Sequence, residues 1–171
     1  MLNQRIRDFA EPHLHSDEQI VVAMAGFRPL TRSAALLSVF PLVLGGLAAG
    51  PAAGINPWIG GAIGGGLGVG MTAWLDQRRA RAEHDGKGLS IGLVVTGQRL
   101  FILNLAAGLI AASVEDIHLE QELGDLTDVE TERMQGSGMK RVGLVLGFRD
   151  GTIERVIPAR LQPFLDALDR T

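Results

Sequence analysis

A long uncharged run separates two segments of the chain in which hydrophobic and polar residues alternate at the spacing of helices or strands. Residues 33–75 contain no Asp, Glu, Lys or Arg. A bilayer core needs roughly 20 apolar residues for one helical span, so this 43-residue run is long enough for two spans. Proline, glycine and asparagine gather in its middle, in the sequence GPAAGINP, and these residues favour a turn. The pattern predicts a transmembrane hairpin of two helices, 34–49 and 57–75.

The alternative interpretation is a buried helical hairpin in a soluble protein. A soluble helix of this length shows a polar face, and neither segment has one, which favours the membrane interpretation. Arginines lie on both sides of the run, and cationic flanks stay on the cytoplasmic side of a membrane. We therefore expect a multi-pass protein of a bacterial inner membrane, with both termini in the cytoplasm.

The second predicted span is rich in glycines that lie four positions apart. The closest pairs are formed by Gly60, Gly61, Gly64, Gly65 and Gly68. This spacing removes side chains from one helix face and lets two backbones approach closely. We expect the face to pack within the hairpin or between copies in a homo-oligomer. A conducting pore is the less favoured alternative, because no charged residue lines either span.

Residues 1–32 are expected to be cytoplasmic and to begin with a short amphipathic helix. Leu2, Ile6 and Phe9 follow a helical spacing, and Pro12 ends the pattern. A helix that docks on the cytoplasmic domain is favoured over one that lies on a membrane surface, because few basic residues face anionic lipid. Residues 19–27 (QIVVAMAGF) are short, apolar and rich in β-formers, which predicts a strand; the less favoured alternative is the start of a longer first helix.

Residues 76–88 (DQRRARAEHDGKG) form a charged linker after the uncharged run. Arg78, Arg79 and Arg81 are candidates for contact with anionic lipid headgroups, each worth about 1 kcal/mol near a membrane surface. Acidic residues in the same linker dilute this charge. A topology signal therefore explains these arginines better than a lipid site does.

From residue 89 to residue 171 the hydrophobic period becomes two, which is typical of strands. The predicted strands are 89–96, 99–105, 109–114, 117–119, 128–134, 141–148 and 152–157. Asp150-Gly151 predicts a two-residue hairpin turn with positive φ at both positions. A helix is expected from Pro163, with its apolar face formed by Phe164, Leu165 and Leu168. The fold class predicted for the whole chain is an α+β membrane protein, with the transmembrane hairpin joined to a small antiparallel β-sandwich or barrel that a C-terminal helix caps.

Composition and charge exclude several functions. The chain has no cysteine, which excludes disulfides, thiolate metal sites and thiol catalysis. Its net charge of −3 argues against a nucleic-acid binder. The serines lack the sequence setting of a nucleophile, and His84 and His118 lack a partner pattern. His13 and His15 are interpreted as solvated loop residues. We therefore expect no enzyme, cofactor or metal site.

Part of the β-rich region is similar to a known family. Residues 93–103 (LVVTGQRLFIL) resemble the strand–turn–strand opening of bacterial PH-like and GRAM-like domains, in which Thr96, Arg99 and Leu100 match the recurring T-x-x-R-L. The segments SVEDI and FRDGT and the C-terminal helix resemble later parts of the same family, so the similarity covers residues 88–170. The resemblance implies a PH-like fold of two packed antiparallel sheets with a C-terminal helix. It implies no particular ligand.

Arg99 is interpreted as a structural residue at the start of a strand, paired with Glu115 or Asp116. The favoured function is a membrane-anchored, non-enzymatic module that recruits or scaffolds a protein partner. A module that binds or senses anionic lipid and a glycine-rich oligomeric pore are the alternatives.

Overall fold

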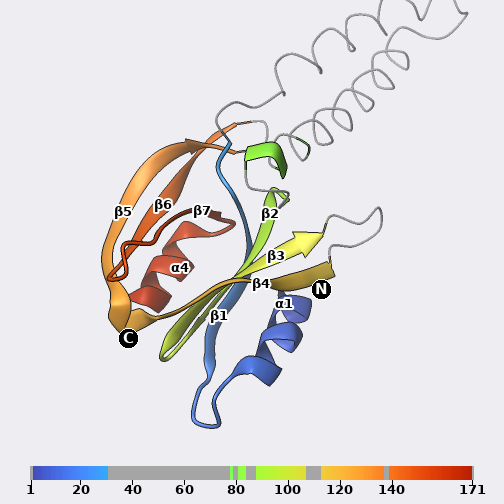
Figure 1. The fold of residues 1–171 in the computed structure, drawn as a ribbon, viewed down its shortest axis with the longest axis vertical. Coiled ribbons are helices and arrows are strands. Elements are labelled where there is room, and N and C mark those ends of the chain that lie inside the picture. Colours follow the sequence, from blue (N-terminus) through green and yellow to red (C-terminus); the bar gives the residue numbers. More distant parts are fainter. Residues whose placement is uncertain are drawn as a thin grey trace, which may run out of the picture.

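The chain forms one antiparallel sheet of seven strands that curls around a helix (Figure 1). The computed structural model describes residues 2–30, 78, 81–83, 88–106, 113–136 and 139–170. The strand order is β4-β3-β2-β1-β7-β6-β5. The strands are β1 (Ile20–Phe27), β2 (Ser90–Thr96), β3 (Arg99–Ala106), β4 (Ser113–Glu122), β5 (Leu126–Gln135), β6 (Lys140–Phe148) and β7 (Ile153–Pro158).

Two short α-helices cover opposite faces of the sheet. Helix α1 (Leu2–Ala10) lies on the outer face, and α4 (Leu161–Leu168) lies inside the curl (Figure 1). The helix α4 begins two residues earlier than predicted, so that Pro163 falls within its first turn, where a missing backbone N–H costs nothing. The predicted docking of α1 on the sheet is confirmed by its packing against β1, β2 and β4.

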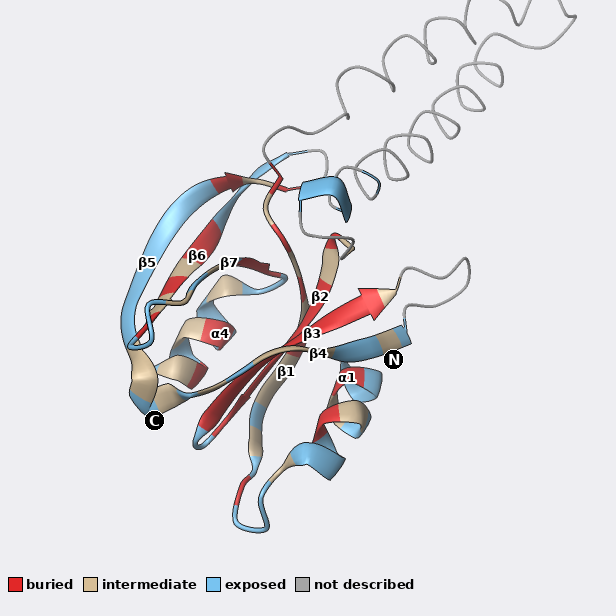
Figure 2. Ribbon diagram, viewed as in Figure 1, coloured by how far each residue is buried: buried red, intermediate tan, exposed pale blue. Residues whose placement is uncertain are grey.

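Strands β2 and β3 are buried along almost their whole length (Figure 2). Their side chains alternate between a core under α1 and a core under α4, so both faces of each strand are covered. This explains their nearly continuous hydrophobic sequences, LVV and LFIL, which a half-exposed strand would interrupt with polar residues. The outer core contains Ile6, Ala10, Val94, Phe101, Leu103 and Leu105. The inner core includes Met24, Leu93, Ile102, Leu144, Leu146 and Phe164.

The strand β1 lies at the centre of the sheet, between β2 and β7. It pairs with β2 along most of its length, but with β7 only through Gly26 and Phe27. The prediction treated residues 1–32 as a region apart from residues 89–171. The structure places β1 inside the sheet that the later residues form, because the edges of β2 and β7 that β1 joins would otherwise have unpaired backbone groups.

The predicted fold class is contradicted and needs correction. Within the described ranges, no helix is both long enough and apolar enough to cross a bilayer. Helix α1 has nine residues and α4 has eight, which at about 1.5 Å per residue is less than half of a bilayer core of about 30 Å. The chain is accordingly described as a curled antiparallel sheet with short helices, in place of an α+β membrane protein. The predicted location, a multi-pass protein of the inner membrane, rested on that fold class and is contradicted by the same finding.

The predicted hairpin, residues 33–75, lies outside the described residues, and so do its glycines. The prediction used hydropathy, missing charge, the turn residues in the middle of the run and the flanking arginines, and it receives no support from any helix described. The packing positions predicted there were Gly60, Gly61, Gly64, Gly65 and Gly68.

The 3₁₀ turn η3 (Leu123–Asp125) connects the two edge strands of the sheet, β4 and β5. Because it joins one edge directly to the other, the sheet curls until the two edges meet at this corner (Figure 1). The amide of Leu123 donates to the carbonyl of Gln98 over 2.7 Å, and the amide of Arg149 donates to the carbonyl of Asp125 over 2.8 Å. These two bonds attach the corner to the β2–β3 and β6–β7 hairpins.

Candidate functional site

The T-x-x-R-L motif forms the tight turn between β2 and β3. The hydroxyl oxygen of Thr96 accepts hydrogen bonds from the amides of Gln98 and Arg99, at 3.2 Å and 2.8 Å. A threonine that bonds two backbone amides in this way fixes the turn, and this is a general use of the residue. Leu100 is fully buried in the inner core. Thr96 and Leu100 are therefore both used by the fold.

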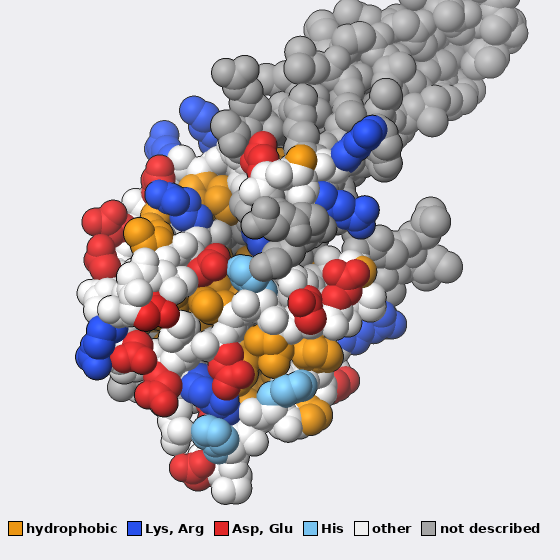
Figure 3. Space-filling view, in the orientation of Figure 1, with side chains coloured by type: hydrophobic (Ala, Val, Ile, Leu, Met, Phe, Trp, Pro, Cys, Tyr) orange, Lys and Arg blue, Asp and Glu red, His pale blue; other side chains and the backbone are white. Residues whose placement is uncertain are grey.

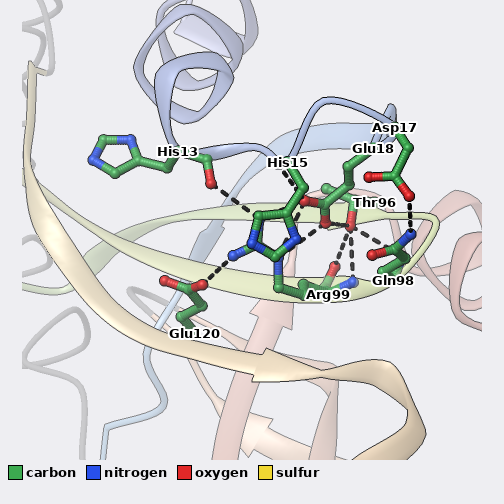
Figure 4. A network of polar contacts seen from close by, with 8 residues as sticks. All are labelled: His13, His15, Asp17, Glu18, Thr96, Gln98, Arg99 and Glu120. Carbon is green, nitrogen blue, oxygen red and sulfur yellow. Dashed lines mark hydrogen bonds and ion pairs between the residues drawn. The ribbon is translucent and has the colours of Figure 1, made fainter.

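Arg99 and Glu18 form a buried ion pair next to this turn (Figure 4). Arg99 Nε lies 3.1 Å from each oxygen of the Glu18 carboxylate, and a terminal nitrogen of the same guanidinium also donates to it. The Thr96 hydroxyl and the amide of His15 donate to Glu18 as well. The side chain of Glu18 is completely buried and that of Arg99 is 9% exposed. This pair attaches the segment before β1 to the β2–β3 hairpin.

Both terminal nitrogens of Arg99 make further contacts. Nη1 donates to Glu120 on β4, and Nη2, which also donates to Glu18, donates to the carbonyl of His13 over 3.0 Å. The guanidinium carbon lies 4.8 Å from the ring centre of Phe101. The predicted partners, Glu115 and Asp116, were wrong, although the structural interpretation of Arg99 agrees with these contacts. Sequence reasoning missed Glu18 because it lies 81 positions before Arg99, in the segment that leads into β1.

Glu18 has a strongly shifted pKa. Hydrogen bonds from Arg99 are the largest cause and lower the pKa of Glu18 from 4.5 to about 2, against the opposing effect of burial. The same contact raises the pKa of Arg99. The pair thus stays charged over the whole range of ordinary pH.

The Glu18 shift predicts an acid-sensitive fold. A carboxyl with a pKa of 4.5 in the unfolded chain and about 2 in the folded chain contributes about 3 kcal/mol of stability above pH 4.5. Because the folded-state pKa is the lower one, this contribution disappears as pH falls from about 4.5 to about 2. Urea unfolding across that interval measures it. Glu18→Gln should flatten the pH dependence there, and an equally steep loss in that variant would contradict the assignment.

A second polar chain lies on the inner face near the end of β1. A terminal nitrogen of Arg28 donates to Asn104 over 2.6 Å, and Asn104 in turn donates to Asp116 over 2.6 Å. Arg28 also donates to the carbonyl of Gly88 over 2.9 Å. Burial lowers the pKa of Arg28, while the charges of Glu154 and Asp116 act in the opposite direction. These contacts hold β1, β3 and β4 together at this end of the sheet.

His118 has a partner that the sequence pattern did not indicate. Its Nε2 lies 3.0 Å from a carboxylate oxygen of Glu154, which joins β4 to β7 across the curl. His13 Nδ1 lies 3.0 Å from the carbonyl of Phe9. Among the described residues, no group of three His, Cys, Asp or Glu side chains is arranged to hold a metal ion.

The arginines predicted to contact lipid were Arg78, Arg79 and Arg81. Arg78 and Arg81 are exposed, and Arg79 lies outside the described residues.

The candidate site that remains is the outer edge of the sheet at β5. This strand has ten residues, and among the described strands it pairs with β6 alone. Every residue from Thr127 to Arg133 is exposed, so neither face of this stretch is covered (Figure 2). We call this stretch, residues 127–133, the β5 edge. Its free backbone groups and side chains form an accessible surface, and the hydrophobic pattern did not distinguish it from the other predicted strands.

Three of the four charged side chains of the β5 edge are acidic, and the fourth is Arg133. Asp128, Glu130 and Glu132 lie at alternate positions, and acidic side chains gather along the left flank of the molecule in Figure 3, where Figure 1 places β5. Compared with known proteins, the chain matches no family model, no curated protein and no solved structure. The PH-like resemblance therefore stays a prediction.

Proposed function

We propose that this protein is a non-enzymatic interaction module that recruits a protein partner through the β5 edge. The observation that carries the proposal is a regular strand at the rim of the sheet, exposed on both faces from Thr127 to Arg133. Such an edge presents unpaired backbone N–H and C=O groups, which commonly pair with a second chain.

The use of the buried polar groups supports a non-catalytic role. Arg99 is surrounded by Glu18, Glu120 and a backbone carbonyl, and Arg28 is held by Asn104 and Gly88. These charged groups join strands that are distant in the sequence. The side chains left accessible at the β5 edge are suited to recognition by contact and charge.

Site-specific photo-crosslinking tests this function. A photoreactive amino acid in place of Thr131 on β5 is expected to capture one defined protein in cells, and that protein should then bind the purified full-length chain. The matched control places the same group at Glu115 on β4, the opposite edge strand, where no capture is expected. Capture from Glu115 but not from Thr131, or a captured protein that fails to bind the purified chain, would refute the proposal.

A further inference from the structure

The free edge of β5 has a charge pattern that specifies a class of partner segment. We infer that the β5 edge accepts an extended basic segment as an additional strand, with Lys or Arg at every second position. The inference rests on the proposed function and names the chemistry of the partner. It follows from the register of β5, from the position of its carboxylates and from the comparison with the other edge strand.

The register places the three carboxylates on one face without charged neighbours across β6. Glu132 lies opposite Gly143, and Asp128 lies opposite Gly147. Glu130 lies opposite Val145. Since glycine and valine bring no positive charge, no cation of β6 lies directly opposite these three carboxylates; Arg141, on the same face of β6, lies opposite Met134.

One basic residue approaches the row from further away. Arg155 of β7 lies 3.8 Å from Glu132, and both side chains are 57% exposed. An ion pair this long and this exposed contributes little. Within the described part of the chain, neither Asp128 nor Glu130 forms an ion pair. The acidic row, Asp128, Glu130 and Glu132, is therefore largely not neutralised within the sheet and can attract a cationic group of another molecule.

The other face of the β5 edge is suited to β-branched side chains. Val129 and Thr131 alternate with the carboxylates, and they lie opposite Leu146 and Leu144 of β6. Val129 is 37% exposed, at a position where an added strand would cover it. A segment that pairs with β5 would place every second residue beside a carboxylate and the residues between them beside Val129 and Thr131. The matching sequence alternates basic and β-branched residues.

A second copy of this chain does not fit the same edge. If two β5 strands paired antiparallel with their acidic faces on the same side, the rows Asp128–Glu130–Glu132 would lie opposite each other. Like charges directly opposite on neighbouring strands are destabilising, and charged edges are a known protection against self-association. The row therefore disfavours a homodimer through this edge and favours a basic partner.

The opposite edge strand is less regular. The register of β4 with β3 shifts twice, between Ile102 and Leu103 and again between Asn104 and Leu105. Such bulges twist an edge and interrupt its row of free backbone groups. The pairing of β5 is continuous from Asp128 to Gln135. Strand addition is thus geometrically easier at β5.

The test measures binding of a synthetic peptide, acetyl-KTKVKTK-amide, to the full-length protein by titration and by NMR. Amide signals of residues 127–133 should shift, and binding should weaken as salt is raised. The scrambled peptide acetyl-KKTKTVK-amide has the same charge without the complete alternation and should bind more weakly.

Charge reversal at the edge separates specific pairing from general attraction. The double variant Glu130→Lys, Glu132→Lys should bind the basic peptide roughly tenfold or more weakly than the original protein, since two favourable cross-strand pairs become repulsive. The same variant should instead bind acetyl-ETEVETE-amide. Glu115→Lys on β4 makes one comparable exposed charge change and should leave affinity nearly unaltered. Unfolding curves should show that all variants remain folded.

Each remaining outcome decides against the inference. Equal binding of the scrambled peptide would show unspecific attraction to a negative surface. Equal loss in Glu115→Lys would place the contact at β4 or in the overall charge. A partner that crosslinks through Thr131 while the basic peptide fails to bind would leave the proposed function intact and refute the basic strand alone.

Discussion

Arg99→Met is expected to lower the free energy of unfolding by about 3–5 kcal/mol. The substitution leaves the Glu18 carboxylate, whose side chain is completely buried, without its guanidinium partner. A buried ion pair adds little net stability, but the removal of one member leaves an uncompensated charge in a poorly polarisable environment. Urea unfolding at neutral pH measures the change.

Two matched variants test the cause of this loss. Arg149→Ala removes a pair with Asp125 at 3.3 Å whose arginine side chain is 72% exposed, and it should cost less than about 1 kcal/mol. The double variant Glu18→Leu, Arg99→Met removes both charges and should recover part of the stability that Arg99→Met loses. If the two single substitutions instead lower the free energy of unfolding by amounts that simply add up in the double variant, Glu18 and Arg99 act independently.

Phe164→Ala is expected to be comparably destabilising, by about 3–5 kcal/mol. Phe164 is fully buried, and it anchors α4 in the inner core that contains Leu93 of β2 and Leu146 of β6. Its removal leaves a cavity between the two halves of the sheet. Thermal and urea unfolding both measure the effect.

Its control is a polar position on the same helix. Gln162→Ala loses an exposed hydrogen bond to Asp166 at 2.8 Å and should change stability by about 0.5 kcal/mol or less. If Phe164→Ala proves as mild as Gln162→Ala, the packing of α4 inside the curl is not what holds the two halves of the sheet together.

Several elements could be read from local patterns. A hairpin forms at Asp150-Gly151 as predicted, but its turn is longer than the predicted two residues, because β6 ends at Phe148 and β7 begins at Ile153. Gly151 has φ of 86°, a conformation that favours glycine, and Asp150 accepts a hydrogen bond from the amide of Thr152 over 2.8 Å. Strand β1 was located within one residue of its observed start. In each case the signal comes from residues close together in the chain.

The largest error arose where a local signal was taken to specify a global architecture. The uncharged run, its central turn residues and its flanking arginines are all properties of one stretch of chain, and the predicted membrane fold was built on them. No described helix supports it. The predicted strand 117–119 and the described end of the predicted strand 109–114 belong to one strand, β4, which continues across Glu115 and Asp116 despite their polarity. Asp116 pairs with Asn104 of β3, and Glu115 lies at a register shift.

The sequence by itself determined where strands and short helices form, since alternation, turn residues and apolar spacing act over a few positions. It also determined that alternate residues of β5 are acidic. Only the tertiary structure decided that β1 lies at the centre of the sheet, that Glu18 pairs with Arg99, and that β5 is an edge. These depend on which distant strands lie side by side, and that choice is made by the burial of both sheet faces under α1 and α4 rather than by any local pattern.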